Sequence, residues 1–473
     1  MYDRMQTFTT TDLQTIHDTS MRILTEIGVA FHDAEALKIF QDHNIKIEGQ
    51  TVFLEERTVR DALESAPSQF TITARNPAQN VRVGEDHFVC VPGYGPPFVM
   101  TREGTQRQGT IEDYDNFCKL VQTSLYLDMN GFMMVEPADV PSETAHLDML
   151  LSNITLCDKA FMGSPVSKAG TQDALEMAGL IWGGKEHIRN MPVMISLINA
   201  LSPLQFSQEM SASLVEFARY GQPCVVASLM MAGTSGPIQI PGLLALQNAE
   251  VLAGITLAQL INPGTPVVYG SASSITHMKI GTLSIGAPEQ AMIISGAAQM
   301  ARFYSLPSRG GGALTDTHLP DMQAGIESAF ALLTAARNGI NFLLHACGIL
   351  NAFLAIGFEK FIIDEELCGM VKTLLTPTAV TPETLDFDTI KQVGIGGQFL
   401  IQPATVKLCR DAFFLPRLAC RKSYADWQAT GAKSLDETAA AHLQTRLAHY
   451  EKPAIDEGLE QALIDFVEHR KAQ

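Results

Sequence analysis

The spacing of hydrophobic and polar positions changes near residue 130 of this chain. In residues 11–27, apolar side chains recur every three or four positions, which predicts an amphipathic helix with Thr10 or Thr11 as its cap. Residues 70–77 and 80–93 alternate between apolar and polar side chains and predict antiparallel strands. We therefore expect residues 1–115 to form an N-terminal α+β cap.

Short apolar runs then alternate with helical segments. The eight runs span residues 131–137, 160–165, 192–199, 223–230, 265–271, 305–312, 341–348 and 397–403. Parallel strands need a crossover of a dozen or more residues, usually a helix, and eight such units over about 270 residues predict a (β/α)8 TIM barrel. The barrel would occupy residues 116–405, and residues 406–473 a C-terminal helical extension. An open doubly wound sheet is the alternative, but no G-x-G-x-x-G motif follows the first run.

Active sites of such barrels lie at the carboxyl ends of the strands. At or near those ends the sequence places Glu136, Ser164, Asn199, Met230, Ser271, Arg309, His345 and Gln402. His345 is unusual because a titratable ring ends an otherwise apolar run. The loop that follows Arg309 carries Gly310, Gly311 and Gly312. Their N–H groups are able to bind a carboxylate or phosphate, and a tight turn between strand and helix explains them equally well.

Several other candidates have both a functional and a structural interpretation. The stiff loop 91–100 presents Tyr94 and Phe98, which suit an apolar or cationic ligand, or it is a junction between cap and barrel. Glu289 starts a helix, whereas Asp316 and Asp321 are able to cap one. The last candidates, which flank the run 160–165, are Lys159 and Lys168. They are conceivable Schiff-base lysines, although nothing around them indicates desolvation.

Composition narrows the class of protein. The net charge of −18 argues against nucleic acid and anionic membranes as partners. Eight cysteines without a C-x-x-C pair predict reduced thiols in a cytoplasmic protein, and no motif predicts a metal site. No apolar signal segment opens the sequence. The long apolar segment 240–264 includes Gln247, Asn248 and Glu250, which predict a core helix rather than a membrane span.

Motifs along nearly the whole chain resemble one family. The stretches, in order, are PGYGPPFV, LSPLQ, PGTPVVYGS, SIGAPEQAM, ARFYSLPSRGGGALTD, LPDMQAGIES, GGQFLIQPAT and FFLPRL. They resemble the trimethylamine methyltransferase superfamily. The resemblance implies a barrel that moves a methyl group from a methylated amine to the cobalt of a cobalamin carried by a separate corrinoid protein, with no cofactor bound tightly by this chain.

The resemblance also indicates a branch of the superfamily. Archaeal members that use trimethylamine carry pyrrolysine at the end of a late barrel strand. The corresponding stretch here is NFLLHACGIL, which places His345 or a near neighbour at that position. This departure implies the non-pyrrolysine branch, whose members resemble methyltransferases of glycine betaine, proline betaine, carnitine or butyrobetaine.

The chemistry agrees with that branch. A quaternary ammonium is already cationic and leaves as a neutral amine, so the enzyme has only to hold it, align a C–N bond with the nucleophile and exclude water. We expect the aromatic rings of Tyr94 and Phe98, followed by Tyr269 and Phe353, to hold the cation. The remaining site candidates, which would bind a carboxylate or face the cofactor, are His345 as a protonated catalytic residue, Arg309, Gly310, Gly311, Gly312, Asp316, Glu289 and Gln402.

The expected reaction is methyl transfer from glycine betaine to the corrinoid, with dimethylglycine as the product. We expect the corrinoid protein to dock over the barrel mouth, and the chain to form a homo-oligomer. Two other classes remain open. One is a non-catalytic barrel that binds or senses betaines, and the other is a Schiff-base aldolase that uses Lys159 or Lys168.

Overall fold

The computed structural model describes residues 4–473, and an eight-stranded parallel sheet forms its centre. The strands are β6 (Val89–Cys90), β9 (Met129–Asn130), β10 (Ala160–Met162), β11 (Met194–Asn199), β13 (Cys224–Ser228), β15 (Val267–Ser271), β18 (Ser308–Arg309) and β19 (Phe342–Leu343). The sheet closes on itself between β6 and β9, where the Asp128 N–H donates to the Cys90 carbonyl at 3.0 Å. The Cys90 N–H returns a hydrogen bond to the Asp128 carboxylate at 2.7 Å. The predicted (β/α)8 barrel is therefore confirmed.

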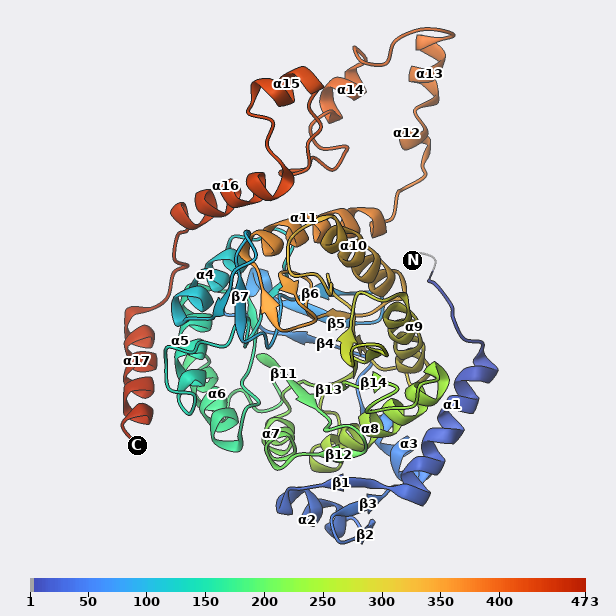
Figure 1. The fold of residues 1–473 in the computed structure, drawn as a ribbon, viewed down its shortest axis with the longest axis vertical. Coiled ribbons are helices and arrows are strands. Elements are labelled where there is room, and N and C mark those ends of the chain that lie inside the picture. The colour runs from blue at the N-terminus through green and yellow to red at the C-terminus, as the bar shows by residue number, and fades with distance from the viewer. Residues whose placement is uncertain (1–3) are drawn as a thin grey trace.

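Eight helices surround the strands (Figure 1). They are α4 (Ile111–Gln122), α5 (Ala145–Leu156), α6 (Lys168–Ile181), α7 (Gln208–Arg219), α8 (Ile240–Ile261), α9 (Pro288–Phe303), α10 (Met322–Arg337) and α11 (Phe358–Leu375). Among the described residues, α8 is the one helix long and apolar enough to cross a bilayer. It lies between the barrel wall and the N-terminal helices, and most of it is buried. The core helix expected at 240–264 is therefore what the fold contains.

The set of barrel strands differs from the prediction at both ends of the chain. The run 397–403 forms no strand, and its residues Phe399, Leu400 and Ile401 are largely exposed. Instead, β6 completes the barrel from within the region expected to be a cap. The strand nearest to the run 131–137 is β9, which ends just before it. Strand β6 lies within residues 80–93, which the alternating pattern assigned to an antiparallel strand of the cap, whereas β6 pairs parallel with β19 in the barrel. An exposed apolar run such as 397–403 shows the same local pattern as a buried strand.

The N-terminal segment packs against the side of the barrel formed by α7, α8 and α9. Helix α1 (Thr10–Arg22) is capped by Thr9, one residue before the expected cap, and packs on α8. The other elements of this segment are η1 (Ile23–Ile27), β1 (Val29–Phe31), α2 (Ala34–Asp42), β2 (Lys46–Glu48), β3 (Thr51–Phe53) and α3 (Glu56–Ser65). The short strand β12 (Gln205–Phe206) pairs with β1.

A hairpin closes the amino-terminal end of the barrel. Strands β4 (Gln69–Ile72) and β5 (Val81–Gly84) pair antiparallel, as expected. The Thr73 N–H after β4 donates to the carbonyl of Pro192, two residues before β11 begins. The opposite end carries two small sheets, formed by β7 (Phe98–Met100), β8 (Gln106–Gln108), β20 (Ile349–Leu350) and β21 (Ala355–Ile356), and by β14 (Met231–Ala232), β16 (Ser274–His277) and β17 (Thr282–Ser284). Only the carboxyl ends of the strands are left for a site.

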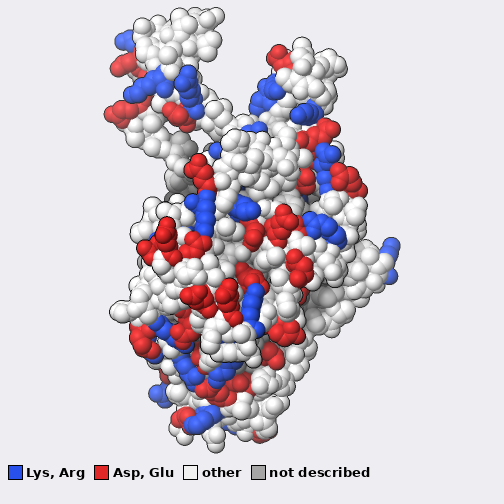
Figure 2. Space-filling view, turned by 90° about the vertical axis from the view of Figure 1, so that its left-hand side faces the viewer, with Lys and Arg blue, Asp and Glu red and all other residues white. Residues whose placement is uncertain are grey.

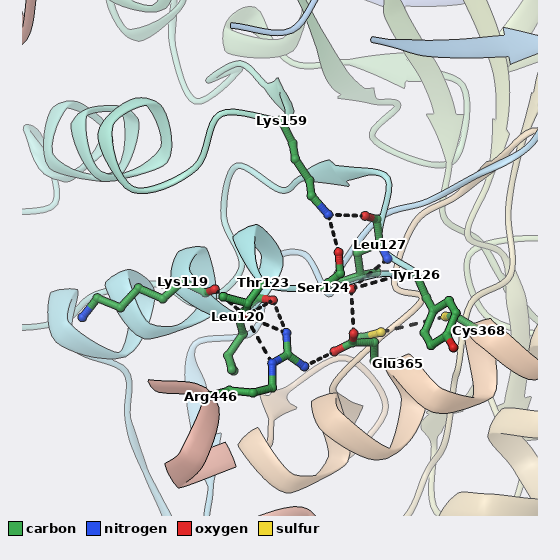
Figure 3. Close-up of polar contacts among 11 residues, drawn as sticks. Lys119, Leu120, Thr123, Ser124, Tyr126, Leu127, Lys159, Glu365, Cys368 and Arg446 are labelled. Carbon is green, nitrogen blue, oxygen red and sulfur yellow. Dashed lines mark hydrogen bonds and ion pairs between the residues drawn. The ribbon is translucent and has the colours of Figure 1, made fainter. Parts of the chain in front are cut away.

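The chain leaves the barrel after α11 and returns later. The short helices α12 (Pro382–Leu385), α13 (Phe387–Val393), α14 (Pro403–Leu408) and α15 (Tyr424–Ala429) project beyond the ring of helices (Figure 1). Helices α16 (Leu435–Ala448) and α17 (Glu457–Lys471) pack against the barrel again. Arg446 of α16 binds the Thr123 hydroxyl at 2.9 Å and the Glu365 carboxylate, which fixes α16 to α4 and α11 (Figure 3).

Candidate functional site

Arg309 and His345 meet at the carboxyl ends of two adjacent strands. Arg309 ends β18 and His345 follows β19, and their side chains are 2% and 5% exposed. The Arg309 guanidinium donates from Nη1 to the Ser271 carbonyl at 2.8 Å and from Nη2 to His345 Nδ1 at 3.2 Å. Its Nε has no partner, and no carboxylate of the described chain pairs with it. Burial lowers the pKa of Arg309 to about 10, so at neutral pH this is a buried, uncompensated cation.

The neighbours of His345 fix its protonation state. His345 Nε2 lies 3.1 Å from the Tyr94 carbonyl, which only accepts hydrogen bonds, so Nε2 carries the proton. Nδ1 then accepts from Arg309. Burial, together with the Arg309 charge, lowers the pKa of His345 well below its ordinary value. His345 is therefore neutral, and the expectation that a protonated His345 pairs with a carboxylate is wrong.

The glycine loop packs directly on the backbone of His345. Gly312 has a φ of +126°, and a Cβ there would lie 2.5 Å from the His345 carbonyl oxygen. The Ala313 N–H donates to that same oxygen at 2.9 Å. A Cβ on Gly311 would meet the Ala335 side chain at 2.3 Å, and the Gly310 N–H already binds Phe342. Close packing therefore accounts for all three glycines, and anion binding by Gly311 and Gly312 stays a prediction.

A strained segment presents an aromatic ring to His345. Asn351, Ala352 and Phe353 have consecutive positive φ angles of 50°, 48° and 74°. Non-glycine residues in this region cost on the order of 1–3 kcal/mol each and cluster at functional sites. The Asn351 N–H is held by the Thr317 carbonyl at 2.8 Å. The result places the Phe353 ring 4.7 Å, between centroids, from the His345 ring. The sequence did not predict this strained segment, because none of the three residues is a glycine.

Tyr94 is the second aromatic residue of the site. Its carbonyl holds His345, and its side chain remains partly exposed. Burial raises the pKa of the Tyr94 phenol, an effect that the nearby Arg309 charge opposes. Among the predicted residues, the structure thus brings together Arg309, His345, Tyr94 and Phe353.

Three other predicted residues lie elsewhere. The Tyr269 ring points out of the barrel wall, with its centroid 6.4 Å from that of Tyr304, so its assignment to the substrate site is wrong. Gln402 precedes α14 in the projecting segment, where its side chain donates to the Gln398 carbonyl at 3.4 Å, so it is not at the barrel mouth either. Phe98, on β7, packs in a separate small cluster with Met100, Leu350 and Ala355.

The acidic candidates have local roles. Asp316 accepts hydrogen bonds from the Ser284 hydroxyl at 2.6 Å and the Ile285 N–H at 2.7 Å, so it joins two loops rather than capping a helix. Asp321 is the cap of α10. Glu289 stands in the first turn of α9 and forms no ion pair in the described chain.

The two lysines proposed for Schiff-base chemistry are not at the mouth. Lys159 precedes β10, at the amino-terminal end, and donates to the carbonyls of Ser124 and Leu127 at 2.7 Å each (Figure 3). Lys168 pairs with Glu35 at 2.8 Å on the surface. Neither therefore faces Arg309, and the aldolase alternative is wrong. Within residues 4–473, no group of three or more His, Cys, Asp or Glu is placed to hold a metal ion.

An ion pair that the sequence analysis missed supports the site from behind. Lys360 of α11 pairs with Asp364 and donates to the Ser328 hydroxyl at 2.9 Å and to the Ala313 carbonyl at 3.4 Å. Asp364 accepts the Gly348 N–H at 2.8 Å, and burial raises the pKa of Asp364 to about 6. The pair thus links the loops that carry Arg309 and His345 to one helix. Its sequence signal was a lysine and an aspartate four residues apart within an apolar helix.

Comparisons with known proteins agree with this architecture. The sequence profile of the trimethylamine methyltransferase (MTTB) family matches residues 1–473. A glycine betaine methyltransferase from Desulfitobacterium hafniense is 45% identical over 461 residues, covering 97% of this chain and 95% of the relative. A proline betaine:corrinoid methyltransferase from Eubacterium limosum is 34% identical, covering 94% and 93%. A trimethylamine methyltransferase from Methanosarcina mazei is 32% identical, covering 97% and 94%.

The fold comparison is more distant. The crystal structure of the Methanosarcina barkeri monomethylamine methyltransferase matches with a TM-score of 0.50 and 11% identity, and the match covers 93% of this chain and 98% of the other. That likeness concerns the fold alone. With a profile match along residues 1–473 and a relative that is 45% identical over 97% of this chain, the protein belongs to the trimethylamine methyltransferase (MTTB) family.

Proposed function

We propose that this chain transfers a methyl group from glycine betaine to the Co(I) of a separate corrinoid protein and releases dimethylglycine. The observation that carries the proposal is the buried Arg309 guanidinium, which has no carboxylate partner in the described chain. Buried charges are normally paired, and a bidentate guanidinium is the best protein group for a carboxylate. A betaine supplies that missing anion.

The other end of glycine betaine is a trimethylammonium group. Such a cation binds to aromatic faces, each worth roughly 0.5–2 kcal/mol. Phe353, fixed against His345, and Tyr94, whose phenol lies near Arg309, are the aromatic residues of the site. In this proposal, Arg309 orients the carboxylate and the two rings surround the methyl groups.

His345 acts through Arg309 rather than as an acid. Its neutral imidazole accepts the Arg309 Nη2–H and donates to the Tyr94 carbonyl, so it holds the guanidinium and the aromatic loop in one arrangement. No proton has to be delivered, because a quaternary ammonium leaves as a neutral amine. The corrinoid supplies the Co(I) nucleophile, and this chain supplies binding, orientation and exclusion of water.

The cellular setting follows from the same proposal. The corrinoid belongs to a partner protein that docks over the carboxyl ends of the strands. The relative from Eubacterium limosum is named a betaine:corrinoid methyltransferase, which supports a corrinoid partner. We further propose a cytoplasmic location, supported by the burial of α8 in the fold and by six buried free cysteines. We also propose that the chain forms a homo-oligomer, which is supported by the large apolar side chains that residues 376–413 expose.

A panel of amines tests the function. The chain is incubated with a corrinoid protein reduced to Co(I) and, separately, with glycine betaine, proline betaine, carnitine, butyrobetaine or trimethylamine, while the visible spectrum reports methylated cobalt. Glycine betaine should react fastest, with stoichiometric dimethylglycine. A faster reaction with proline betaine would make proline betaine the preferred substrate. Binding of glycine betaine without turnover would instead indicate a betaine-sensing protein.

A further inference from the structure

The segment of residues 376–413, here called the arm, exposes an unusual amount of apolar surface. Its large apolar side chains that are at least 48% exposed are Val380, Leu385, Phe387, Ile390, Ile395, Phe399, Leu400, Ile401, Val406, Leu408 and Phe413. A half-exposed large side chain leaves roughly 100 Å², so these eleven leave on the order of 1,000 Å². The largest apolar patch on a typical monomer is about 300–600 Å². The arm therefore exposes more apolar surface than a typical monomer leaves in one patch.

The base of the arm is firmly built. The Glu366 carboxylate on α11 accepts the N–H groups of Arg417, Leu418 and Ala419 at 2.6, 2.8 and 2.9 Å. Leu418 is buried there. The chain thus leaves α11 at residue 376 and is clamped back onto the same helix at residue 417. From this fixed base the arm extends outside the ring of helices (Figure 1), and Figure 2 shows uncharged surface at the tips of the projecting segments, with charged side chains of both signs beside it.

A matching apolar surface lies next to that base. On α10, Met322, Ile326 and Phe330 follow one another at four-residue spacing and are 82%, 64% and 48% exposed. On α11, Met370 and Leu374 are 44% and 62% exposed. A cavity of about 430 Å³ between the two helices is lined by Ala329, Leu333, Leu367, Met370, Leu374 and Phe414. We call this surface the α10–α11 face.

We propose that the arm of each chain covers the α10–α11 face of a second copy in a reciprocal exchange. Both halves of the contact belong to the same chain and lie side by side, which is the arrangement that a two-fold, self-complementary interface requires. The exposed area is also sufficient, because a stable interface buries about 800 Å² on each partner.

The corrinoid protein is a poorer occupant of these surfaces. A protein that docks for each turnover leaves its site exposed between encounters, whereas surfaces this apolar are typical of permanent interfaces. The arm also projects sideways from the helix ring, and not over the carboxyl ends of the strands where the corrinoid has to reach (Figure 1). The inference does not depend on which methyl donor is used.

The mass of the full chain in solution tests the exchange. Light scattering coupled to size exclusion at about 10 μM should give at least twice the 51.4 kDa of the chain. The single variants Ile401→Glu on the arm and Ile326→Glu on the α10–α11 face should each reduce the mass to that of one chain. The matched control is Ile27→Glu, because Ile27 is 59% exposed on the N-terminal segment, at the opposite end of the molecule in Figure 1. It should leave the mass unchanged.

A mixing experiment distinguishes exchange from other contacts. An equimolar mixture of the two charge variants retains one intact pair, the arm of Ile326→Glu with the face of Ile401→Glu, and should regain part of the association. Circular dichroism checks that each variant is folded, and both altered side chains are exposed in the single chain. A wild-type chain that is monomeric, folded variants that keep the wild-type mass, or a mixture that stays monomeric would each overturn the proposal.

Discussion

Arg309 Nη2 donates to His345 Nδ1 at 3.2 Å, and this contact makes the histidine an acceptor rather than an acid. The other ring nitrogen, Nε2, keeps its proton and donates it in a hydrogen bond to the Tyr94 carbonyl at 3.1 Å. The pair therefore presents one buried positive charge, located on Arg309, at the end of β18. The functional proposal depends on that charge and on the absence of a carboxylate partner for it among the described residues.

Replacing Arg309 should abolish the binding of glycine betaine without lowering the stability of the ligand-free protein. The variant Arg309→Gln removes a buried charge that has no counter-ion, so the ligand-free protein should be at least as stable as the wild type. Glycine betaine should raise the Tm of the wild type but not that of the variant. Differential scanning calorimetry with and without the betaine measures both effects. Loss of stability in the ligand-free variant would indicate that Arg309 is a structural residue.

His345 should make stability depend on pH. Its pKa is lowered well below the ordinary 6.5 by burial and by Arg309, so below pH 6.5 the unfolded chain gains a proton that the folded chain does not. The contribution of His345 to the free energy of unfolding is fully present above pH 6.5 and decreases as the pH falls. Between pH 7.5 and 5.5 this contribution should fall by about 1.4 kcal/mol. The variant His345→Gln should lack that part of the loss. Urea unfolding at both pH values measures it, and equal losses in the two proteins would contradict the assignment.

The two site loops should not tolerate a side chain at Gly312. Its φ of +126° and the 2.5 Å approach to the His345 carbonyl mean that Gly312→Ala should destabilise the fold by about 1–3 kcal/mol and lower turnover. Gly325 is the matched control, because it is an exposed glycine of α10 with open space around its Cβ position. Gly325→Ala should stabilise by about 0.5–1 kcal/mol. Chemical denaturation compares the free energies of unfolding of the two variants. Equal changes in the two would show that close packing at Gly312 does not limit the side chain there.

Much of the barrel could be predicted because its central strands leave a strong pattern. Strands β11, β13 and β15 are apolar runs of five or six residues, each bounded by a polar or turn segment, and they appear where the runs were found. Strand β6 was predicted as part of an antiparallel strand at 80–93, because local alternation does not show that it pairs parallel with the distant β19. The run 397–403 of the arm was predicted to be a barrel strand because it contains the apolar stretch Phe399–Ile401. These side chains are exposed, and the run forms no strand.

The main residues of the site could be predicted from the sequence, but the protonation state of His345 could not. Arg309 and His345 followed from the rule that barrel sites lie at strand ends. The direction of Tyr269 was not predictable, because alternation does not show which face of a buried strand points inward. It becomes clear only from the structure, where the Ser271 hydroxyl, two positions on and therefore on the same face, bonds to Gln247 on α8. The neutral state of His345 depends on Arg309 and on the Tyr94 carbonyl, which come from distant segments. Their convergence cannot be read from either segment alone.

The stability of the fold should decrease far more when one partner of the buried Lys360–Asp364 ion pair is removed than when both charges are removed. Lys360→Met leaves the Asp364 carboxylate buried and unpaired, which should cost about 3–5 kcal/mol. The double variant with Asp364→Asn has no charge left, and its amide oxygen is still able to accept the Gly348 N–H, so it should recover most of that loss. A double-mutant cycle by urea unfolding measures the coupling. Additive losses would mean that the pair does not act as a unit.

The central claim is that Arg309 recognises the carboxylate of a quaternary amine. Its most direct measurement compares kcat/KM for glycine betaine and for choline, in which an alcohol replaces the carboxylate, in the wild type and in Arg309→Gln with a Co(I) corrinoid protein. Charge-assisted hydrogen bonds of about 1.5–3 kcal/mol predict that the wild type prefers glycine betaine by roughly 10- to 100-fold or more, and that the variant loses this preference. An Arg309→Gln enzyme that still prefers glycine betaine by the wild-type factor would contradict the account.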